Sequence, residues 1–202
     1  MKMLRNFTIR FVMLTILGIF CVMWAGVGLY STWSLSRVSD GNDVDRQLVR
    51  QMTVLSQGND QYFRFVTRLS RAMEVKAAGG TPDLAPAQQA LDNMSKKLAE
   101  MKAISPGPMD EKMSAQVIST WQALLDRGVT PQMAQAKQAT LEGYRQHANN
   151  VTPPLSRAFG SAAENFNNTA AKALDSTRVV VDGLTSMTRT VIITATIVGL
   201  LI

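Results

Sequence analysis

Residues 48–73 read LVRQMTVLSQGNDQYFRFVTRLSRAM, and the spacing of the apolar residues in this stretch decides the fold class. The apolar positions recur at alternating intervals of four and three residues, which is the pattern of one buried helix face. This face consists of Leu48, Met52, Leu55, Asn59, Tyr62, Val66, Leu69 and Met73, with Asn59 as its polar member. The pattern predicts a long helix that packs one side against other helices and continues to about Ala78.

Clusters of glycine, proline and asparagine divide the chain beyond this helix. They lie at residues 79–82, 105–108, 128–131 and 149–154. The segments between them carry apolar residues at helical spacing, which predicts helices over about 83–104, about 109–128, about 131–146 and from Pro153 onward. Short loops between long amphipathic helices favour antiparallel neighbours. We therefore expect an all-α domain in the form of an up-down four-helix bundle.

An uncharged run precedes the bundle. Residues 11–30, FVMLTILGIFCVMWAGVGLY, are twenty residues without a charge, enough to cross a membrane as a helix. Three basic residues and no acidic residue precede the run, which predicts a cytoplasmic N-terminus. The alternative is a cleaved signal peptide. An anchor is favoured because the run exceeds the usual length of about 7–15 residues, and because Trp24, Tyr30 and Trp33 resemble interfacial anchors.

A second uncharged run, TVIITATIVGLLI, occupies residues 190–202 and is too short to span a bilayer. One interpretation is the front half of a longer protein, cut within its second transmembrane helix; the other is a short hydrophobic tail. The first predicts a stub over residues 1–10, a transmembrane helix over 11–33, an exported bundle over 34–188 and the start of a second transmembrane helix over 189–202. The bundle would then lie between two transmembrane helices.

The composition disfavours several classes of function. Between residues 31 and 189 there are 18 basic and 15 acidic residues, too even a balance for a nucleic-acid partner. Cys21 lies within the first apolar run, and His147 is the only histidine, so we expect no metal site and no cofactor. His147 stands in the polar stretch YRQHANN and is expected to be solvated. No nucleophile, base or glycine-rich phosphate loop indicates an enzyme.

Three arginines on the first bundle helix are the informative feature. Arg64, Arg68 and Arg71 fall within an arc of about 60°, on the side away from the expected core. One interpretation is a solvated face, in which Arg64 pairs with Asp60 and Arg71 pairs with Glu74 at helical spacing.

The aromatic residues around these arginines suggest the other interpretation, a ligand site. Tyr62, Phe63 and Phe65 alternate with the arginines. A guanidinium group binds carboxylate through two parallel hydrogen bonds, so aromatic neighbours would suit a carboxylate ligand. Ring-bearing acids fit at least as well as aliphatic di- or tricarboxylates.

Two local motifs and the overall organisation carry a family resemblance. They are TRLSRAM at residues 67–73 and VTPPLSRAFGSA at residues 151–162. Together with the two apolar runs and about 155 residues of helical pattern between them, they make the chain similar to bacterial methyl-accepting chemotaxis receptors. The likeness is to the ligand-binding domain of the enteric aspartate and serine receptors.

The resemblance implies roles for individual residues. Arg71 aligns with a ligand-contacting arginine of the family and Thr152 with a ligand-contacting threonine. The family's two other arginines fall at Val66 and Val75, so we expect arginines of neighbouring turns to replace them. An asparagine that holds the ammonium group of amino-acid ligands has no equivalent, which implies an organic acid. The expected ligand-binding residues are Arg71, Arg68, Arg64, Thr152, Tyr62 and Phe63.

The resemblance further implies a multi-pass receptor of the bacterial inner membrane, with residues 34–188 in the periplasm. It implies a homodimer with the ligand at the subunit interface, a small displacement of the last helix on binding, and cytoplasmic kinase and coupling proteins as partners of a following segment. Two alternatives stay open: the input domain of a sensor histidine kinase or cyclic-nucleotide enzyme, and a membrane-tethered helical structural protein without a ligand.

Overall fold

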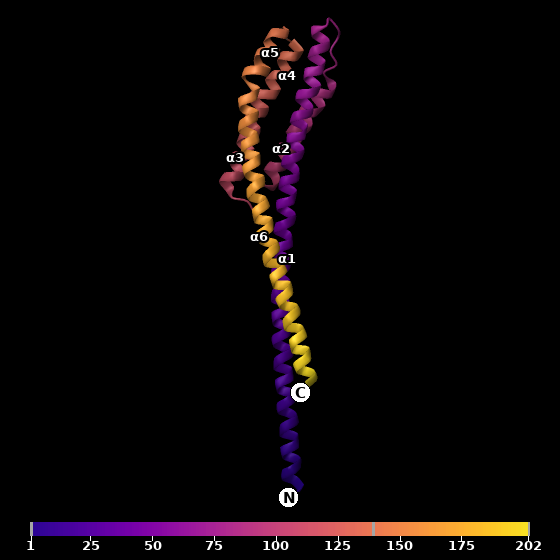
Figure 1. The fold of residues 1–202 in the computed structure, drawn as a ribbon, viewed down its shortest axis with the longest axis vertical. Coiled ribbons are helices and arrows are strands. Elements are labelled where there is room, and N and C mark those ends of the chain that lie inside the picture. The colour runs from indigo at the N-terminus through magenta and orange to yellow at the C-terminus, as the bar shows by residue number, and fades with distance from the viewer. Residues whose placement is uncertain (1, 139, 202) are drawn as a thin grey trace. The chain divides into compact units, whose positions relative to one another are not determined.

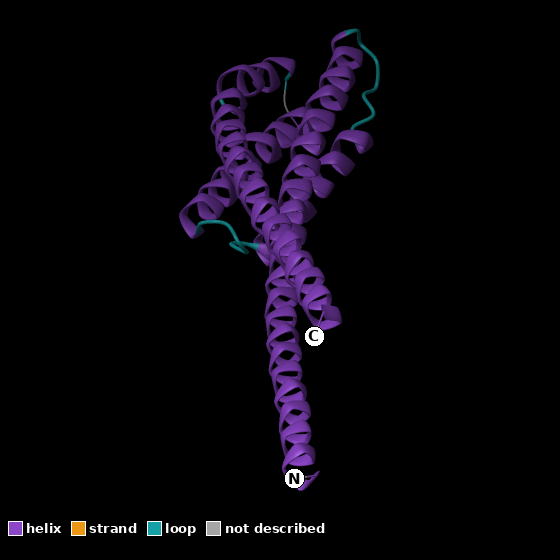
Figure 2. Ribbon diagram, turned by 60° about the horizontal axis from the view of Figure 1, so that its bottom comes forward, coloured by secondary structure: helices purple, strands orange, loops and turns teal. Residues whose placement is uncertain are grey.

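The structure is a computed structural model that describes residues 2–138 and 140–201, and it is built from helices (Figure 1). Those residues form helices and loops without a strand (Figure 2), so the predicted all-α class is confirmed. The elements are α1 (Lys2–Ala77), α2 (Ala85–Ile104), α3 (Glu111–Ala123), the π-helix η1 (Leu124–Val129), α4 (Thr130–Gln138), α5 (Leu141–Asn150) and α6 (Thr152–Leu201).

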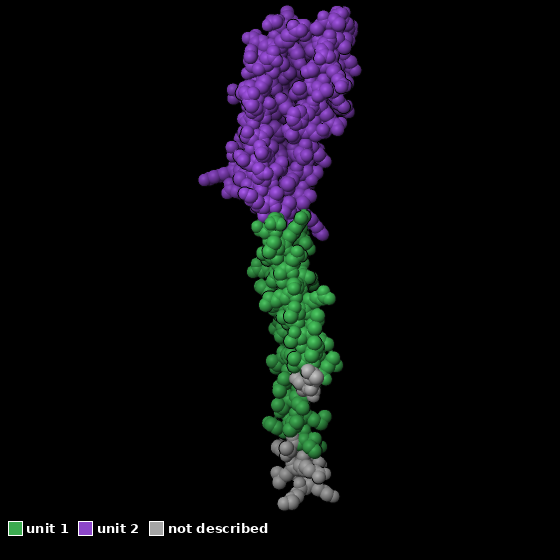
Figure 3. Space-filling model, viewed as in Figure 1, with its two compact units in different colours: residues 1–44, 175–202 green, residues 45–174 purple. Residues whose placement is uncertain are grey.

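The chain divides into two compact units (Figure 3). The larger unit, Asp45–Leu174, holds the end of α1, all of α2 to α5 and the first part of α6. The smaller unit comprises residues 1–44 and 175–202, and so contains the remaining parts of α1 and α6. Each unit is described by itself below.

The larger unit is the predicted four-helix bundle. Its long members are α1, α2, the run from α3 through η1 to α4, and α6. The short helix α5 connects α4 to α6 at the end of the unit that also holds the loop between α1 and α2 (Figure 1). The up-down order follows from the short connections, which allow only antiparallel neighbours.

The apolar face of α1 forms much of the core of this bundle. Leu48, Leu55, Leu69 and Met73 are buried, whereas Asn59 and the other predicted members are half-buried. The buried face is wider than predicted, because it also includes Phe65, whose side chain is 0% exposed. The expectation that Phe65 accompanies the arginines is therefore wrong. A helix that contacts neighbours on two sides buries a broader stripe than a narrow coiled-coil seam.

The third helical run differs from the prediction at Gly128. We expected a break over 128–131, but the chain continues from α3 into α4 through the π-helix η1. The N–H of Thr130 donates to the carbonyl oxygen of Leu125, five residues earlier. This wider turn admits Pro131, which has no N–H to give to an ordinary helical bond. Gly128 and Val129 are buried within it.

The connection before α6 also differs from the prediction. In place of one helix over 131–146, α4 ends at Gln138 and α5 begins at Leu141, where the side chain of Thr140 accepts a hydrogen bond from the N–H of Gly143 at 3.4 Å. The predicted start of the last helix is confirmed, because α6 begins at Thr152 with its two prolines in the first turn. Proline is favoured there because first-turn N–H groups have no helical partner.

In the smaller unit, the parts of α1 and α6 lie against each other. The hydroxyl groups of Ser34 and Thr188 are 2.5 Å apart, and Gly199 faces the ring of Phe20. Two helical segments, within Ile9–Ala77 and Leu141–Leu200, are long and apolar enough to cross a membrane by length and composition, with mean hydropathies of 2.3 and 1.3.

Candidate functional site

The three arginines of α1 lie in different surroundings. The Nε of Arg64 is 2.7 Å from a carboxylate oxygen of Asp60, in an exposed ion pair that contributes a few tenths of a kcal/mol. Arg68 is half-buried and donates to the backbone carbonyl of Pro86 at 3.0 Å, which ties α1 to α2. Arg71 is exposed, and no ion pair with Glu74 forms in the described chain.

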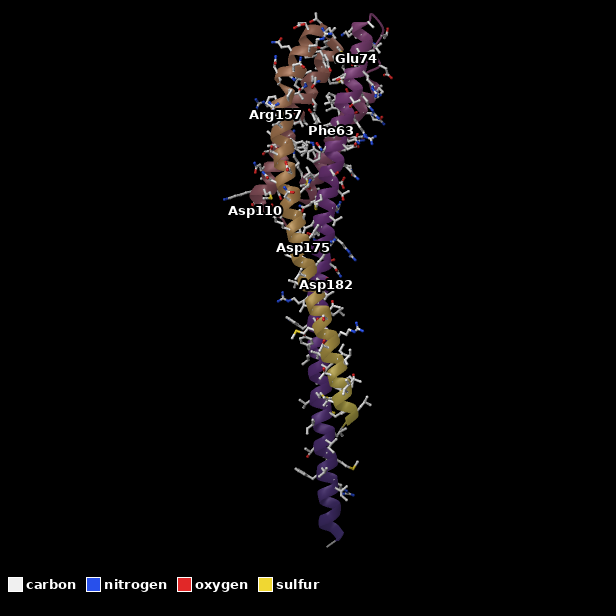
Figure 4. All side chains as sticks on the ribbon, viewed as in Figure 1. Phe63, Glu74, Asp110, Arg157, Asp175 and Asp182 are labelled. Carbon is white, nitrogen blue, oxygen red and sulfur yellow. The ribbon has the colours of Figure 1, made fainter. Side chains whose placement is uncertain are left out.

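The aromatic residues beside these arginines also differ in how far they are buried. Phe63, labelled on α1 in Figure 4, is an exposed residue. Its relative exposure is 58%, and its ring centroid is 5.5 Å from that of half-buried Tyr62. Phe65, two residues beyond Phe63 and so on the opposite side of α1, belongs to the core. Phe63 and Arg71 therefore share an exposed face of α1, whereas Tyr62 turns toward α5 and α6.

Tyr62 lines a cleft of about 510 Å³ within the larger unit. This volume falls in the range of small-molecule sites. One wall comes from the last turns of α1 and consists of Tyr62, Val66, Ser70, Met73, Glu74 and Ala77. The facing side comes from α5 and consists of Leu141, Tyr144, Arg145, Ala148 and Asn149. Gln132 of α4 and the first turns of α6, with Thr152, Pro153 and Ser156, complete the lining.

Thr152 is held firmly in this cleft. Its side chain is 3% exposed, and its hydroxyl donates to the side-chain oxygen of Gln132 at 2.8 Å. Gln132 is likewise 3% exposed. Because the hydroxyl proton is engaged by Gln132, Thr152 could only accept a further hydrogen bond. The structure thus brings Tyr62 and Thr152 together, and it places Phe63, Arg64 and Arg71 outside the lining.

The cleft contains charged residues that were not singled out from the sequence. Arg145 of α5 and Glu74 of α1 both line it, and both are exposed. The sequence does hold a signal for Arg145, because Leu141, Tyr144, Arg145 and Ala148 fall on one face at helical spacing. The predicted helix ended at about residue 146, so Ala148, which completes this face, lay beyond it.

His147 is not solvated as expected. It is half-buried, and its Nε2 lies 2.9 Å from the carbonyl oxygen of Gly128 in the π-helix η1. A π-turn leaves carbonyl groups without their ordinary helical partners, so a side-chain donor is favourable there. This bond holds α5 against η1 and thereby supports the wall that carries Tyr144 and Arg145.

In the described parts of the chain, no group of three or more His, Cys, Asp and Glu side chains is placed to hold a metal ion. The chemistry that the cleft offers is therefore hydrogen bonding through hydroxyl, amide, guanidinium and carboxylate groups, beside apolar walls.

The chain is similar to one family of known proteins and to a solved structure. Residues 3–174 match the family described as Tar ligand binding domain homologue. A crystal structure of the N-terminal ligand-binding domain of an inferred methyl-accepting chemotaxis protein from Salmonella enterica is 65% identical in sequence and has a TM-score of 0.65. The similarity covers 66% of the present chain and 98% of the Salmonella chain. A search of curated proteins gave no match.

Proposed function

Because this chain belongs to the family of Tar ligand-binding domain homologues, we propose that it senses a small organic acid, ring-bearing or aliphatic, for a membrane chemoreceptor. The family is one of sensor domains that bind ligands and carry out no catalysis. The single observation that supports a ligand role is the cleft that holds Tyr62 and Thr152 between α1, α5 and α6. Its volume and its mixture of polar and apolar walls suit a small molecule.

The proposed assembly is a homodimer in which α1 packs against α1 of a second copy. The exposed face of α1 in the larger unit carries large apolar side chains, including Val49, Phe63 and Val75 at 47%, 58% and 47% exposure. Removing such groups from water stabilises an interface. The same face carries Arg71, so one copy would bring that guanidinium toward ligand held by the other.

The proposed signal is a shift of α6. This helix runs without a break from Thr152 in the cleft to Leu201 in the second apolar run. A ligand that binds one position of α6 more tightly than another shifts the population between them by its difference in affinity. The receiving partners would be cytoplasmic coupling and kinase proteins, reached through a following segment.

The proposed membrane arrangement has residues 11–33 crossing the inner membrane, residues 34–188 in the periplasm and residues 189–202 beginning a second crossing. Exposed side chains such as Leu14, Val22 and Leu29, at 68%, 75% and 75%, would be covered by lipid. A periplasm-dependent alkaline phosphatase fused after Ala90 should be active. An inactive fusion that is stable and folded would contradict this arrangement.

Calorimetry on the chain of residues 1–202 in lipid nanodiscs tests the proposed ligand class. Benzoate, succinate and citrate represent ring-bearing, di- and tricarboxylic acids, with aspartate and glucose as the zwitterionic and neutral comparisons. We expect at least one of the acids to bind and to raise the melting temperature by mass action. Binding of aspartate or glucose alone would contradict the proposal.

A further inference from the structure

Two unlike charges line the cleft from different walls. Glu74 stands on the last turns of α1 (Figure 4), and Arg145 stands on α5. Neither side chain forms an ion pair or a hydrogen bond in the part of the chain that the structure describes. A guanidinium and a carboxylate that border one cavity without neutralising each other are both available to a ligand.

Arg145 is the sole cation among the described residues that line the cleft. None of the three arginines of α1 is a lining residue. Arg64 pairs with Asp60, Arg68 is bonded to the backbone of α2, and Arg71 is exposed. Arg145 is therefore the cation that the cleft lining itself offers to a carboxylate. Asn149, one helical turn farther along α5, adds an amide donor on that side.

We propose that Arg145 binds the ligand's carboxylate and that Glu74 selects ligands with a hydrogen-bond donor, rather than a second carboxylate, at their other end. This inference rests on the proposed function and narrows its ligand class. It assigns the ligand specificity of the cleft to Arg145 and Glu74, which are not among the ligand-binding residues predicted from the sequence.

The role of Glu74 follows from its chemistry. An ionised carboxylate only accepts hydrogen bonds, so it stabilises a hydroxyl or ammonium group of a ligand. A second carboxylate placed near it is repelled and finds no donor there, which discriminates against dicarboxylates. The rings of Tyr62 and Tyr144 and the side chains of Val66 and Met73 supply apolar contact for the middle of such a ligand.

A series of acids with one benzene ring tests both halves of the proposal. Benzoate carries no second group, whereas 4-hydroxybenzoate, 4-(aminomethyl)benzoate and terephthalate place a hydroxyl, an ammonium or a carboxylate opposite the first carboxylate. The ring and the first carboxylate stay the same, so differences in affinity report the second group. For residues 1–202 in nanodiscs, we expect the hydroxyl and ammonium compounds to bind more tightly than benzoate, and terephthalate to bind least tightly.

Variants of Arg145 test the carboxylate contact. Arg145→Ala should weaken binding of 4-hydroxybenzoate by about tenfold or more, and Arg145→Lys should recover part of the loss, because lysine keeps the charge without the bidentate fork. Arg157→Ala is the matched control, since Arg157 is an exposed arginine of α6 outside the cleft lining. Unchanged melting temperatures would show that all three variants are folded.

Glu74→Gln tests selection by the second group. It should lower the affinity for 4-(aminomethyl)benzoate and raise the affinity for terephthalate, each by several-fold. The difference in affinity between the two compounds should therefore shrink or change sign. Glu164→Gln, at an exposed position of α6, should change neither.

Different results would contradict the proposed function and the assignment of Arg145 and Glu74. If none of the acids, the aliphatic ones included, binds the unaltered chain, the proposed function is wrong. If ring acids bind but Arg145→Ala leaves their affinity unchanged, or Glu74→Gln leaves the order of the series unchanged, only the assignment of these two residues is overturned.

Discussion

Gly58 of α1 lies against the indole ring of Trp121 of α3, so closely that a Cβ atom at position 58 would overlap the six-membered ring. Trp121 is fully buried and also contacts Phe159 of α6, with 5.2 Å between ring centroids. The absence of a side chain at residue 58 therefore lets the largest core residue sit between α1 and α6. The backbone of Gly58 is helical, a conformation that any residue can adopt. Close packing against Trp121 is therefore the reason that this position lacks a side chain.

Gly58→Ala should destabilise the bundle. Alanine is favoured over glycine in a helix by about 1 kcal/mol, but overpacking a rigid core costs about 1–3 kcal/mol because the indole must move. We expect a lower melting temperature by circular dichroism of the chain in detergent. Gly160→Ala on α6 is the matched control, because nothing lies within 4 Å of its Cβ position, and it should raise the melting temperature slightly. Equal gains in both variants would contradict this packing.

Asp110→Ala should weaken the start of α3. The carboxylate of Asp110 (Figure 4) accepts hydrogen bonds from the N–H groups of Lys112 and Met113 at 2.9 and 3.1 Å. Loss of such a cap costs about 1 kcal/mol. Asp110→Asn keeps an oxygen acceptor and should retain most of the stability in the same melting experiment. If the alanine variant melts like the unaltered chain, the cap is energetically unimportant.

Thr152→Val should lower stability through Gln132. The substitution keeps the side-chain volume but removes the donor to the buried oxygen of Gln132, and an unsatisfied buried acceptor costs about 1–3 kcal/mol. Thr152→Ser keeps the hydroxyl and should melt close to the unaltered chain. A valine variant that is as stable as the serine variant would show that water replaces the lost bond.

Arg71→Ala tests the proposed contribution of the α1 arginines to ligand binding. The side chain is exposed, so the melting temperature without ligand should change little. Loss of a charge-assisted contact of about 1.5–3 kcal/mol should weaken binding of an effective acid by tenfold or more in calorimetry. Arg71→Lys should restore only part of the affinity. Affinity equal to that of the unaltered chain would assign Arg71 to a solvated face.

Cysteines at positions 34 and 188 should form a disulfide readily. The hydroxyl oxygens of Ser34 and Thr188 are 2.5 Å apart, which places the β-carbons within reach of a bridge. The experiment uses a Cys21→Ser background, and a ligand-independent shift on non-reducing gels reports the bond. Trp33→Cys combined with Thr188→Cys should cross-link far more slowly, because residue 33 lies about 100° around the helix. Equal rates for both pairs would contradict the helix register.

The sequence by itself determined the helical character of this protein and most of its boundaries. Residues such as Leu48, Leu55 and Leu69 recur at a helical period, so their burial could be inferred from their spacing along the sequence alone. Pro153 and Pro154 marked the start of α6 because proline can occupy only the first turn of a helix without loss. The exposure of Arg64 and Arg71 followed from the same periodicity.

Only the tertiary structure decided which residues border the cleft. Glu74, Arg145 and Thr152 come from three helices, and no local rule relates their positions. Phe65 is buried because α1 contacts neighbouring helices on more than one side. The helix continues through Gly128 because a π-turn forms there, and the carbonyl oxygen of Gly128 is bonded by the side chain of His147. Periodicity reports which face of one helix is apolar. It carries no information on which faces of different helices meet, because that is set by loop lengths and side-chain volumes acting together.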